Sequence, residues 1–193
     1  MIDNFEKIKK IMSFDDENDF YFFQAIKRRK DNPGMDKGEI AIKDWYVGSF
    51  EYFDKKIENM IEIATSHNAR ITMRVNKRNY KKASTKMLIE LAKMIDSEQY
   101  RSSKKVFSSV CGKYSSDPVK KWIIDVDSED MNNINEIKNV IQRSLPEGNK
   151  ILMDIPSKTG VHIITKAFDL REFNKLFEKV EIKKDNPTNI YIP

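Results

Sequence analysis

The chain has 193 residues, of which 39% are hydrophobic and 34% charged, with a formal net charge of +5. This length can bury a sizeable core as one domain, 1–193. The single cysteine, Cys111, excludes an internal disulfide, and with only His67 and His162 beside it no zinc site is expected. No apolar run approaches the roughly 20 residues that span a bilayer. We therefore expect a soluble, cytoplasmic protein without a membrane partner.

Strand and helix patterns alternate through the first part of the chain. Pro33-Gly34 marks the turn of an expected hairpin, Ser49 is placed to cap a helix, and the apolar pattern fades where Ser, Lys and Gly become frequent. The expected elements are strands 19–28 and 39–47, a helix over 50–64, strand 69–77, a helix over 80–95, and a loop or linker over 96–121. Residues 1–121 are thus expected to form a mixed α/β N-terminal half.

Residues 122–193 show a clearer pattern. The expected elements are strand 122–127, helix 130–145, strands 150–155 and 161–166, helix 169–178 and a final extended stretch over 180–192. This β-α-β-β-α-β order is that of the ferredoxin-like fold, in which the first strand is central. The fold class is therefore expected to be α+β.

Two carboxylates stand out on the first of these strands. Asp125 and Asp127 are two positions apart, so their side chains should share one face of the sheet. Like charges this close need a counter-charge, which a divalent cation with oxygen ligands supplies. The alternative is a strand end at which both acids simply reach solvent or cap the next helix.

A histidine and a Ser/Thr/Gly turn are expected beside this acid pair. His162 lies on the third strand of the core, next to the central strand, and Ser157-Lys158-Thr159-Gly160 directly precedes it. A turn with free backbone N–H groups, hydroxyls and one Lys can hold an anion. Carboxylates for metal together with Lys, hydroxyl and imidazole groups for phosphate are what nucleotidyl transfer requires.

The segments WIIDVD and IPSKTGVHIIT resemble the motifs of the archaeo-eukaryotic primase superfamily, the primase-polymerases. The resemblance is specific over 122–193 and weak over 1–121, and the compact form is similar to small enzymes of phages and mobile elements. It implies an RRM-like catalytic core with the mixed α/β N-terminal half packed on it, and a DNA primase or polymerase that uses Mg²⁺ or Mn²⁺. Template DNA and nucleoside triphosphates would be its partners, with a replicative helicase as a further one.

The resemblance also implies roles for single residues. Asp125 and Asp127 would bind the metal ions, and Ser157, Lys158, Gly160 and His162 would hold the triphosphate of the incoming nucleotide. A third acid is expected on the last strand, where Glu181 and Asp185 share a parity. Asp185 is favoured for this catalytic and metal-binding role, and Asp154 is a weaker candidate.

The positive charge is concentrated in the middle of the chain. Residues 66–121 hold 14 Lys and Arg against four acids, a local balance of +10, so the remainder sums to −5. Such a segment favours a polyanion partner, although a solvated basic face is the alternative. The expected contacts to nucleic acid or nucleotide are Arg74, Asn76, Arg78, Lys81 and Lys82, followed by Arg101, Lys104 and Lys105, with Tyr100, Phe107 and Tyr114 as stacking candidates.

Three functions therefore compete. The first is a template-directed nucleotidyltransferase that makes or extends primers. The second is a non-catalytic RRM-like module that binds single-stranded nucleic acid, although acids at the centre of its sheet would repel RNA. The third is a metal-dependent nuclease that uses the same carboxylates, with Lys158 and His162 on the scissile phosphate.

Overall fold

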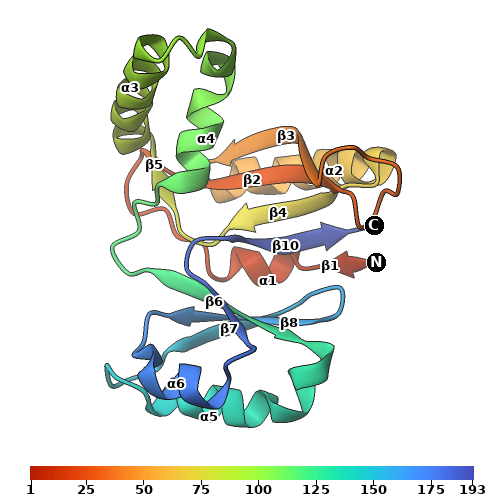
Figure 1. Ribbon diagram of the computed structural model, residues 1–193, viewed down its shortest axis with the longest axis vertical. Helices are drawn as coiled ribbons and strands as arrows, with labels where there is room; N and C mark the ends of the chain where they lie inside the picture. The colour runs from red at the N-terminus through yellow and green to blue at the C-terminus, as the bar shows by residue number, and fades with distance from the viewer.

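The computed structural model describes residues 1–193 as two antiparallel sheets with six α-helices (Figure 1). The upper sheet has the strand order β1-β10-β4-β2-β3, with β5 paired to β2, and the lower sheet has the order β7-β8-β6-β9. The upper strands are β1 (Ile2–Asp3), β2 (Asp19–Arg28), β3 (Glu39–Val47), β4 (Arg70–Arg74), β5 (Arg78–Asn79) and β10 (Pro187–Ile192). The lower strands are β6 (Lys121–Asp127), β7 (Ile151–Pro156), β8 (Gly160–Lys166) and β9 (Glu181–Lys183). The expected α+β class is confirmed.

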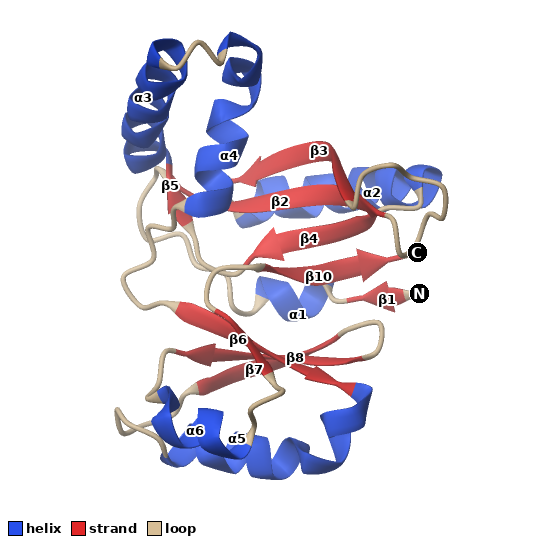
Figure 2. Cartoon of the chain, in the orientation of Figure 1, coloured by secondary structure: helices blue, strands red, loops and turns tan.

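The upper sheet and the lower sheet share one hydrophobic core. Helix α2 (Phe50–His67), capped by Ser49, covers one face of the upper sheet, and α1 (Phe5–Lys9) lies between the sheets (Figure 2). Alternate residues of β2, such as Phe23, pack in this core together with Ile164 of the lower sheet. Because burying apolar surface is the main driving force for packing, this common cluster holds the two sheets together.

The face of the lower sheet that looks toward the upper one is partly apolar and partly polar. Helices α5 (Ile134–Arg143), preceded by the short 3-10 helix η2 (Ser128–Asn133), and α6 (Leu170–Leu176) lie on its outer face (Figure 2). Ile124 and Val126 point to these helices and are fully buried in a second core cluster. Since side chains alternate along a strand, Asp125 and Asp127 project from the opposite face, toward the upper sheet.

The final stretch of the chain corrects the expectation that the C-terminal core runs to residue 193. The sequence predicted a single extended segment over 180–192, but β9 contains only three residues and pairs with β6. The chain then crosses to the upper sheet, where β10 lies between β1 and β4. The lower unit, residues 121–183, is therefore inserted between two parts of the upper unit.

Residues 96–121 are not the loop that the sequence predicted. Helix α3 (Tyr80–Asp96), the 3-10 helix η1 (Tyr100–Lys105) and α4 (Val106–Lys113) form a helical arm that projects from the upper sheet (Figure 1). Val110 and Cys111 pack against Phe20 and Phe22 of β2 at the base of this arm. Only a few apolar residues of the short helix α4 are buried, which explains why its sequence shows little helical periodicity. None of the helices combines the length and apolar character needed to cross a membrane.

Candidate active site between the sheets

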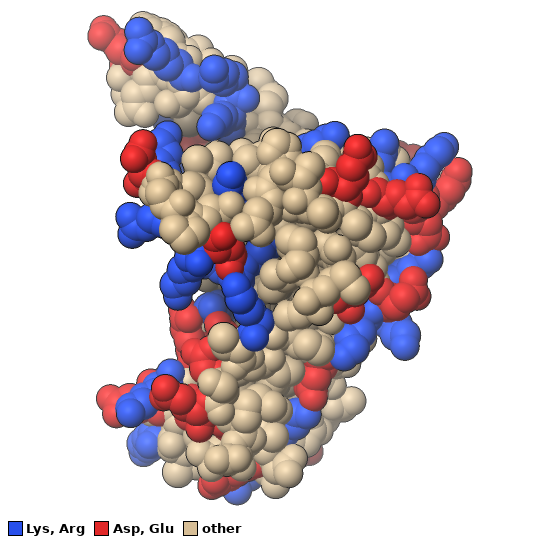
Figure 3. All heavy atoms as spheres, turned by 90° about the vertical axis from the view of Figure 1, so that its right-hand side faces the viewer, with Lys and Arg blue, Asp and Glu red and all other residues tan.

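A polar cleft of about 630 Å³ opens between the two sheets. Ile26 is the only large apolar side chain in its lining, which contains both acids and bases. Figure 3 shows both kinds of charge at the waist of the molecule. The charged and histidine side chains of the lining are Arg28, Lys30, Asp31, Glu39, Arg70, Asp125, Asp127, Lys158, His162, Glu181 and Lys183. A cleft of this size and polarity suits a charged small molecule rather than an apolar one.

Asp125 and His162 meet at the floor of the cleft. They are register partners on β6 and β8, and His162 Nε2 lies 3.2 Å from Asp125 Oδ1. The other ring nitrogen, Nδ1, lies 2.8 Å from the hydroxyl of Thr188 on β10. Both the imidazole and Thr188 are buried, so the ring orientation is held from both sheets at once.

Lys183 completes an ionic cluster around Asp125. Its ammonium donates to Asp125 Oδ2 and lies 3.2 Å from a carboxylate oxygen of Glu181. Burial raises the pKa of the Asp125 carboxyl, but the hydrogen bonds from His162 and Lys183 outweigh it and leave the pKa at about 2. Asp125 is therefore ionised at neutral pH and already has a counter-charge.

The turn between β7 and β8 lies beside Asp127. The Ser157 N–H donates to the Gly160 carbonyl at 2.9 Å, which closes the turn, and the Thr159 hydroxyl donates to Asp127 Oδ1 at 3.3 Å. Gly160 pairs with Asp127 across the strands. The residues that the sequence predicted for phosphate binding thus lie at the same end of the cleft as the second acid.

Asp31, which the sequence analysis missed, bridges the two units. Its carboxylate accepts two hydrogen bonds from Arg70 at 2.6 and 2.9 Å and one from Lys158 at 2.8 Å. The hydrogen bond from Arg70 holds the pKa of Asp31 well below its usual range, against the effect of burial and with help from Lys158. Asp31 lies in the turn region between β2 and β3, where no periodicity marks an acid as functional.

The structure separates the three candidates for a third acid. Asp185 does not line the cleft, because its carboxylate accepts from Arg78 Nη2 at 2.9 Å and from Asn76 Nδ2 at 3.0 Å. Asp154 lies on the opposite face of the lower sheet, where it pairs with Lys138 of α5. Glu181 is the register partner of Asp125 and shares its face, so it is the acid that the fold brings to the pair.

The segment Arg74–Arg78 is structural and does not form the nucleic-acid surface that the sequence predicted. Asn76 and Arg78 have no exposed surface. Asn76 accepts from the Lys121 N–H at 2.7 Å and donates to Asp185, while Arg78 binds Asp185 and the Cys111 carbonyl. Arg74 donates to the Asp185 carbonyl. These side chains fasten together the two points at which the chain passes between the units, and we call them the crossover clamp.

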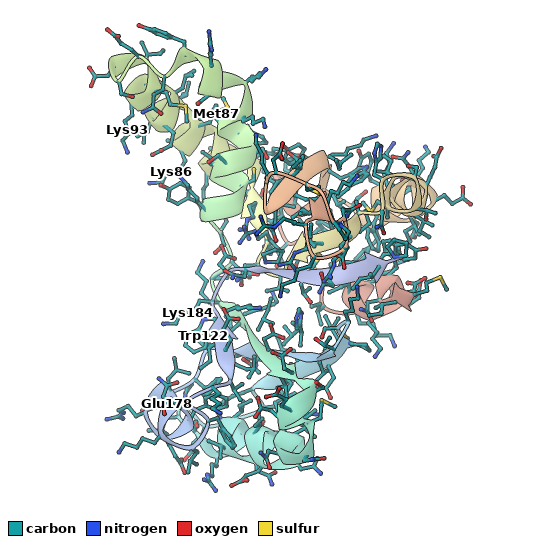
Figure 4. The ribbon with its side chains drawn as sticks, turned by 45° about the vertical axis from the view of Figure 1, so that its right-hand side comes forward. Lys86, Met87, Lys93, Trp122, Glu178 and Lys184 are labelled. Atoms are coloured by element: carbon teal, nitrogen blue, oxygen red, sulfur yellow. The ribbon has the colours of Figure 1, made fainter.

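The remaining predicted nucleic-acid contacts lie on or beside the arm. Lys81 and Lys82 are exposed in the first turn of α3, and Arg101, Lys104 and Lys105 belong to η1. Of the stacking candidates, Tyr100 and Tyr114 are exposed, whereas Phe107 packs against the cluster at the base of the arm. A further cation–π contact, Lys184 over Trp122 at 5.2 Å, lies at the crossing into the lower unit (Figure 4).

The acids of the cleft match a divalent cation in chemistry but not in their present arrangement. Asp125, Asp127 and Glu181 offer hard oxygen donors from one sheet face, which suits Mg²⁺ or Mn²⁺. No three acidic, His or Cys side chains converge on one point, however, and Lys183 holds the place of a counter-ion to Asp125. Metal binding would therefore require the Lys183 ammonium to leave Asp125.

Comparisons with protein-family models, with curated proteins and with solved structures found no match.

Proposed function

We propose that the protein is a metal-dependent, template-directed nucleotidyltransferase of the primase-polymerase type that makes or extends primers on DNA. The observation that carries this proposal is the Asp125–His162 pair at the floor of a polar cleft, with Asp127 and the Ser157–Gly160 turn at the same end. Acid oxygens for cations and an imidazole beside a Lys and hydroxyls for phosphates are the groups that nucleotidyl transfer needs. The strand order of the lower sheet supports an RRM-like core within this proposal.

Each group in the cleft has a task in this proposal. Asp125, Asp127 and Glu181 would hold Mg²⁺ or Mn²⁺, which supplies charge neutralisation of the triphosphate and activation of the primer hydroxyl. His162, whose ring is held by Thr188 at Nδ1, would donate to a phosphate oxygen from Nε2 once a metal ion replaces the imidazole at Asp125. Lys158 and Arg70 would bind the outer phosphates in place of Asp31, since both cations already hold an anionic group there.

A second candidate is the non-catalytic module that binds single-stranded nucleic acid. The ion pair between Lys183 and Asp125 favours it, because a carboxylate with a resident ammonium has no need of a metal ion. In this case the acids would stabilise the fold, and removing them would leave nucleic-acid binding unchanged.

A primer-extension assay with labelled nucleotides, a primed single-stranded template and Mg²⁺ or Mn²⁺ tests both candidates. We expect extension by the unchanged protein and at least a hundredfold loss in the variant Asp125→Asn/Asp127→Asn, since a site for cations would lose both charges. In His162→Ala we expect the KM for nucleotide to rise at least tenfold with unchanged template affinity. The control is Glu129→Gln, an exposed acid two positions beyond Asp127.

The outcomes separate the candidates. Extension that survives in Asp125→Asn/Asp127→Asn would overturn the proposed site. No extension by any variant, with template binding intact in all of them, would favour the non-catalytic module. Shortened template in place of extended primer would instead assign the same carboxylates to a nuclease.

A further inference from the structure

The cations of the basic middle segment fall into two groups. Five of the 14 Lys and Arg in 66–121 form ion pairs with acids, and Arg74 lies inside the crossover clamp. The other eight have no carboxylate partner and belong to the arm or to the segment that leads from it: Lys81, Lys82, Lys86, Arg101, Lys104, Lys105, Lys113 and Lys120. The arm at the top of Figure 3 shows part of this basic surface. The unneutralised charge is thus on the arm and its exit, whereas most cations of the cleft are paired.

A hollow of about 310 Å³ lies at the base of the arm, among these free cations. Its lining contains no acid and consists of Lys82, Ala83, Thr85, Lys86, Tyr114, Ser115 and Ser116. The Lys86 ammonium lies 5.4 Å from the centre of the Tyr114 ring, and 40% of Tyr114 is exposed. Lys120 donates to the hydroxyl of Ser115, one of the lining residues, at 2.5 Å.

The orientation of the α3 side chains places the charge on one side of the helix. Met87 lies between α3 and α4, whereas Lys86 and Lys93 project from another side (Figure 4). Lys93 is paired with Glu90 on the same helix, so Lys82 and Lys86 are the free cations of α3 that line the hollow. An aromatic ring, two free ammonium groups and two serines thus meet in one place.

We propose that this hollow binds one unpaired nucleotide of a single-stranded DNA, with the base against the Tyr114 ring and its phosphates at Lys82 and Lys86. Bases stack on exposed aromatic rings, and free ammonium groups bind the phosphate backbone by releasing its counterions. Because Lys86 lies over Tyr114, base and phosphate would be neighbouring groups of the same nucleotide. The exposed aliphatic residues of α3, such as Leu88 and Ile95, are not in the hollow, which argues against an apolar protein partner there. The binding of a single strand in the hollow does not depend on the proposed function; only the identification of this strand as the template rests on it.

The test is the binding of a fluorescein-labelled oligothymidylate to the full chain, followed by anisotropy without metal or nucleotide. We expect Tyr114→Ala to weaken binding about tenfold and Tyr114→Phe to retain it, since stacking needs the ring and not the hydroxyl. Lys82→Gln/Lys86→Gln should reduce the slope of log affinity against log salt by about one, because up to two phosphate contacts are lost. The matched controls are Tyr52→Ala and Lys55→Gln/Lys56→Gln on α2, where Lys56 lies 5.3 Å from the Tyr52 ring and neither residue lines the hollow.

Three outcomes would overturn the proposal. The first is equal binding by Tyr114→Ala and Tyr52→Ala, with thermal unfolding showing that both variants are folded. The second is a salt slope that falls as much in Lys55→Gln/Lys56→Gln as it does in Lys82→Gln/Lys86→Gln. The third is an acidic peptide such as polyglutamate that competes for the hollow as well as the oligonucleotide does, which would point to a protein partner.

The same assay separates this inference from the proposed function. Asp125→Asn/Asp127→Asn should bind the oligonucleotide like the unchanged protein, because these acids lie in the cleft and not in the hollow. If extension fails while the dependence on Tyr114 holds, only the proposed function falls. If extension proceeds with no dependence on Tyr114, only the binding site in the hollow falls.

Discussion

Gly160 is the glycine at which the backbone leaves least room for a side chain. A Cβ atom at this position would lie 2.0 Å from the Val126 carbonyl oxygen and 3.0 Å from the Cα of Asp127. Both atoms belong to the backbone of β6, so no side-chain movement can relieve the overlap. The sequence resemblance assigned Gly160 to nucleotide binding, and the close approach of β8 to β6 gives a steric reason for glycine there.

We expect Gly160→Ala to lower the free energy of unfolding by about 2 kcal/mol or more, because the strands must separate to admit the methyl group. Urea unfolding followed by far-ultraviolet circular dichroism measures this change. Gly38→Ala is the control, since a Cβ atom there meets nothing within 4 Å. Equal stability of the two variants would contradict the steric argument.

The acid pair could be placed from the sequence, but the third acid could not. Alternation along WIIDVD put Asp125 and Asp127 on one face because β6 is regular over its whole length. The same reasoning left Glu181 and Asp185 equivalent. They differ because β9 ends at Lys183, and the chain turns away before Asp185 to enter the clamp. Because tertiary contacts decide where β9 ends, the sequence around Lys183 carries no local pattern that marks the end of the strand.

At the scale of elements, β5 and the segment before it show how a basic stretch is misassigned. The sequence predicted that Arg74, Asn76 and Arg78 contact nucleic acid or nucleotide. Arg78 and Asn76 are instead buried and hydrogen-bonded to the crossing segments. The sequence shows the number and spacing of the charges but not the groups that they bind. Here those groups are Asp185 and backbone carbonyls far along the chain. The neighbouring lysines of α3, which have no acidic partner, remain candidates for nucleic-acid binding.

Replacing Arg78 should therefore affect stability and not nucleic-acid contact. We expect Arg78→Met to lower the free energy of unfolding by about 3–5 kcal/mol, because Asp185 and the Cys111 carbonyl lose a buried charged donor. The salt dependence of oligonucleotide binding should keep its slope in the folded variant. Lys81→Met, at an exposed position in the first turn of α3, is the comparison. It should keep the free energy of unfolding of the unchanged protein and show a reduced salt slope. Unchanged stability with a reduced slope in Arg78→Met would restore the original prediction.

At the scale of the whole molecule, the two units are held at opposite ends of the cleft by different means. The crossover clamp lies at the start of β6, and the Asp31 contact to Lys158 lies near its other end, about 20 Å away along the strand (Figure 1). At the clamp, the chain itself passes twice between the units, so covalent bonds join them there. At the other end, the Asp31 contact is an ion pair between two turns. Opening of the cleft is therefore easiest at the Asp31 end.

This contact should weaken in acid. The pKa of Asp31 is lowered by Arg70 and Lys158, so its ion pairs stabilise the fold above the ordinary carboxyl pKa of about 4 and are lost as the pH falls below it. We expect Asp31→Asn to be less stable than the unchanged protein by about 2 kcal/mol at pH 7, with the difference shrinking toward pH 2. Urea unfolding at several pH values checks this, with the exposed Asp36 of the same loop replaced by Asn as control. A difference that is constant with pH would show that Asp31 acts through packing and not through its charge.

The insertion of the lower unit also has a consequence for how this fold can be rebuilt. Residues 121–183 leave and re-enter the upper unit at two points that Asn76 holds next to each other. The lower unit is therefore an insertion with two adjacent junctions. Another βαββαβ segment that replaces it must keep the apolar positions of Ile123, Ile155 and Ile164, because these side chains share a core with the upper sheet. A library of such chimaeras would vary the chemistry of the cleft floor while the helical arm stays unchanged.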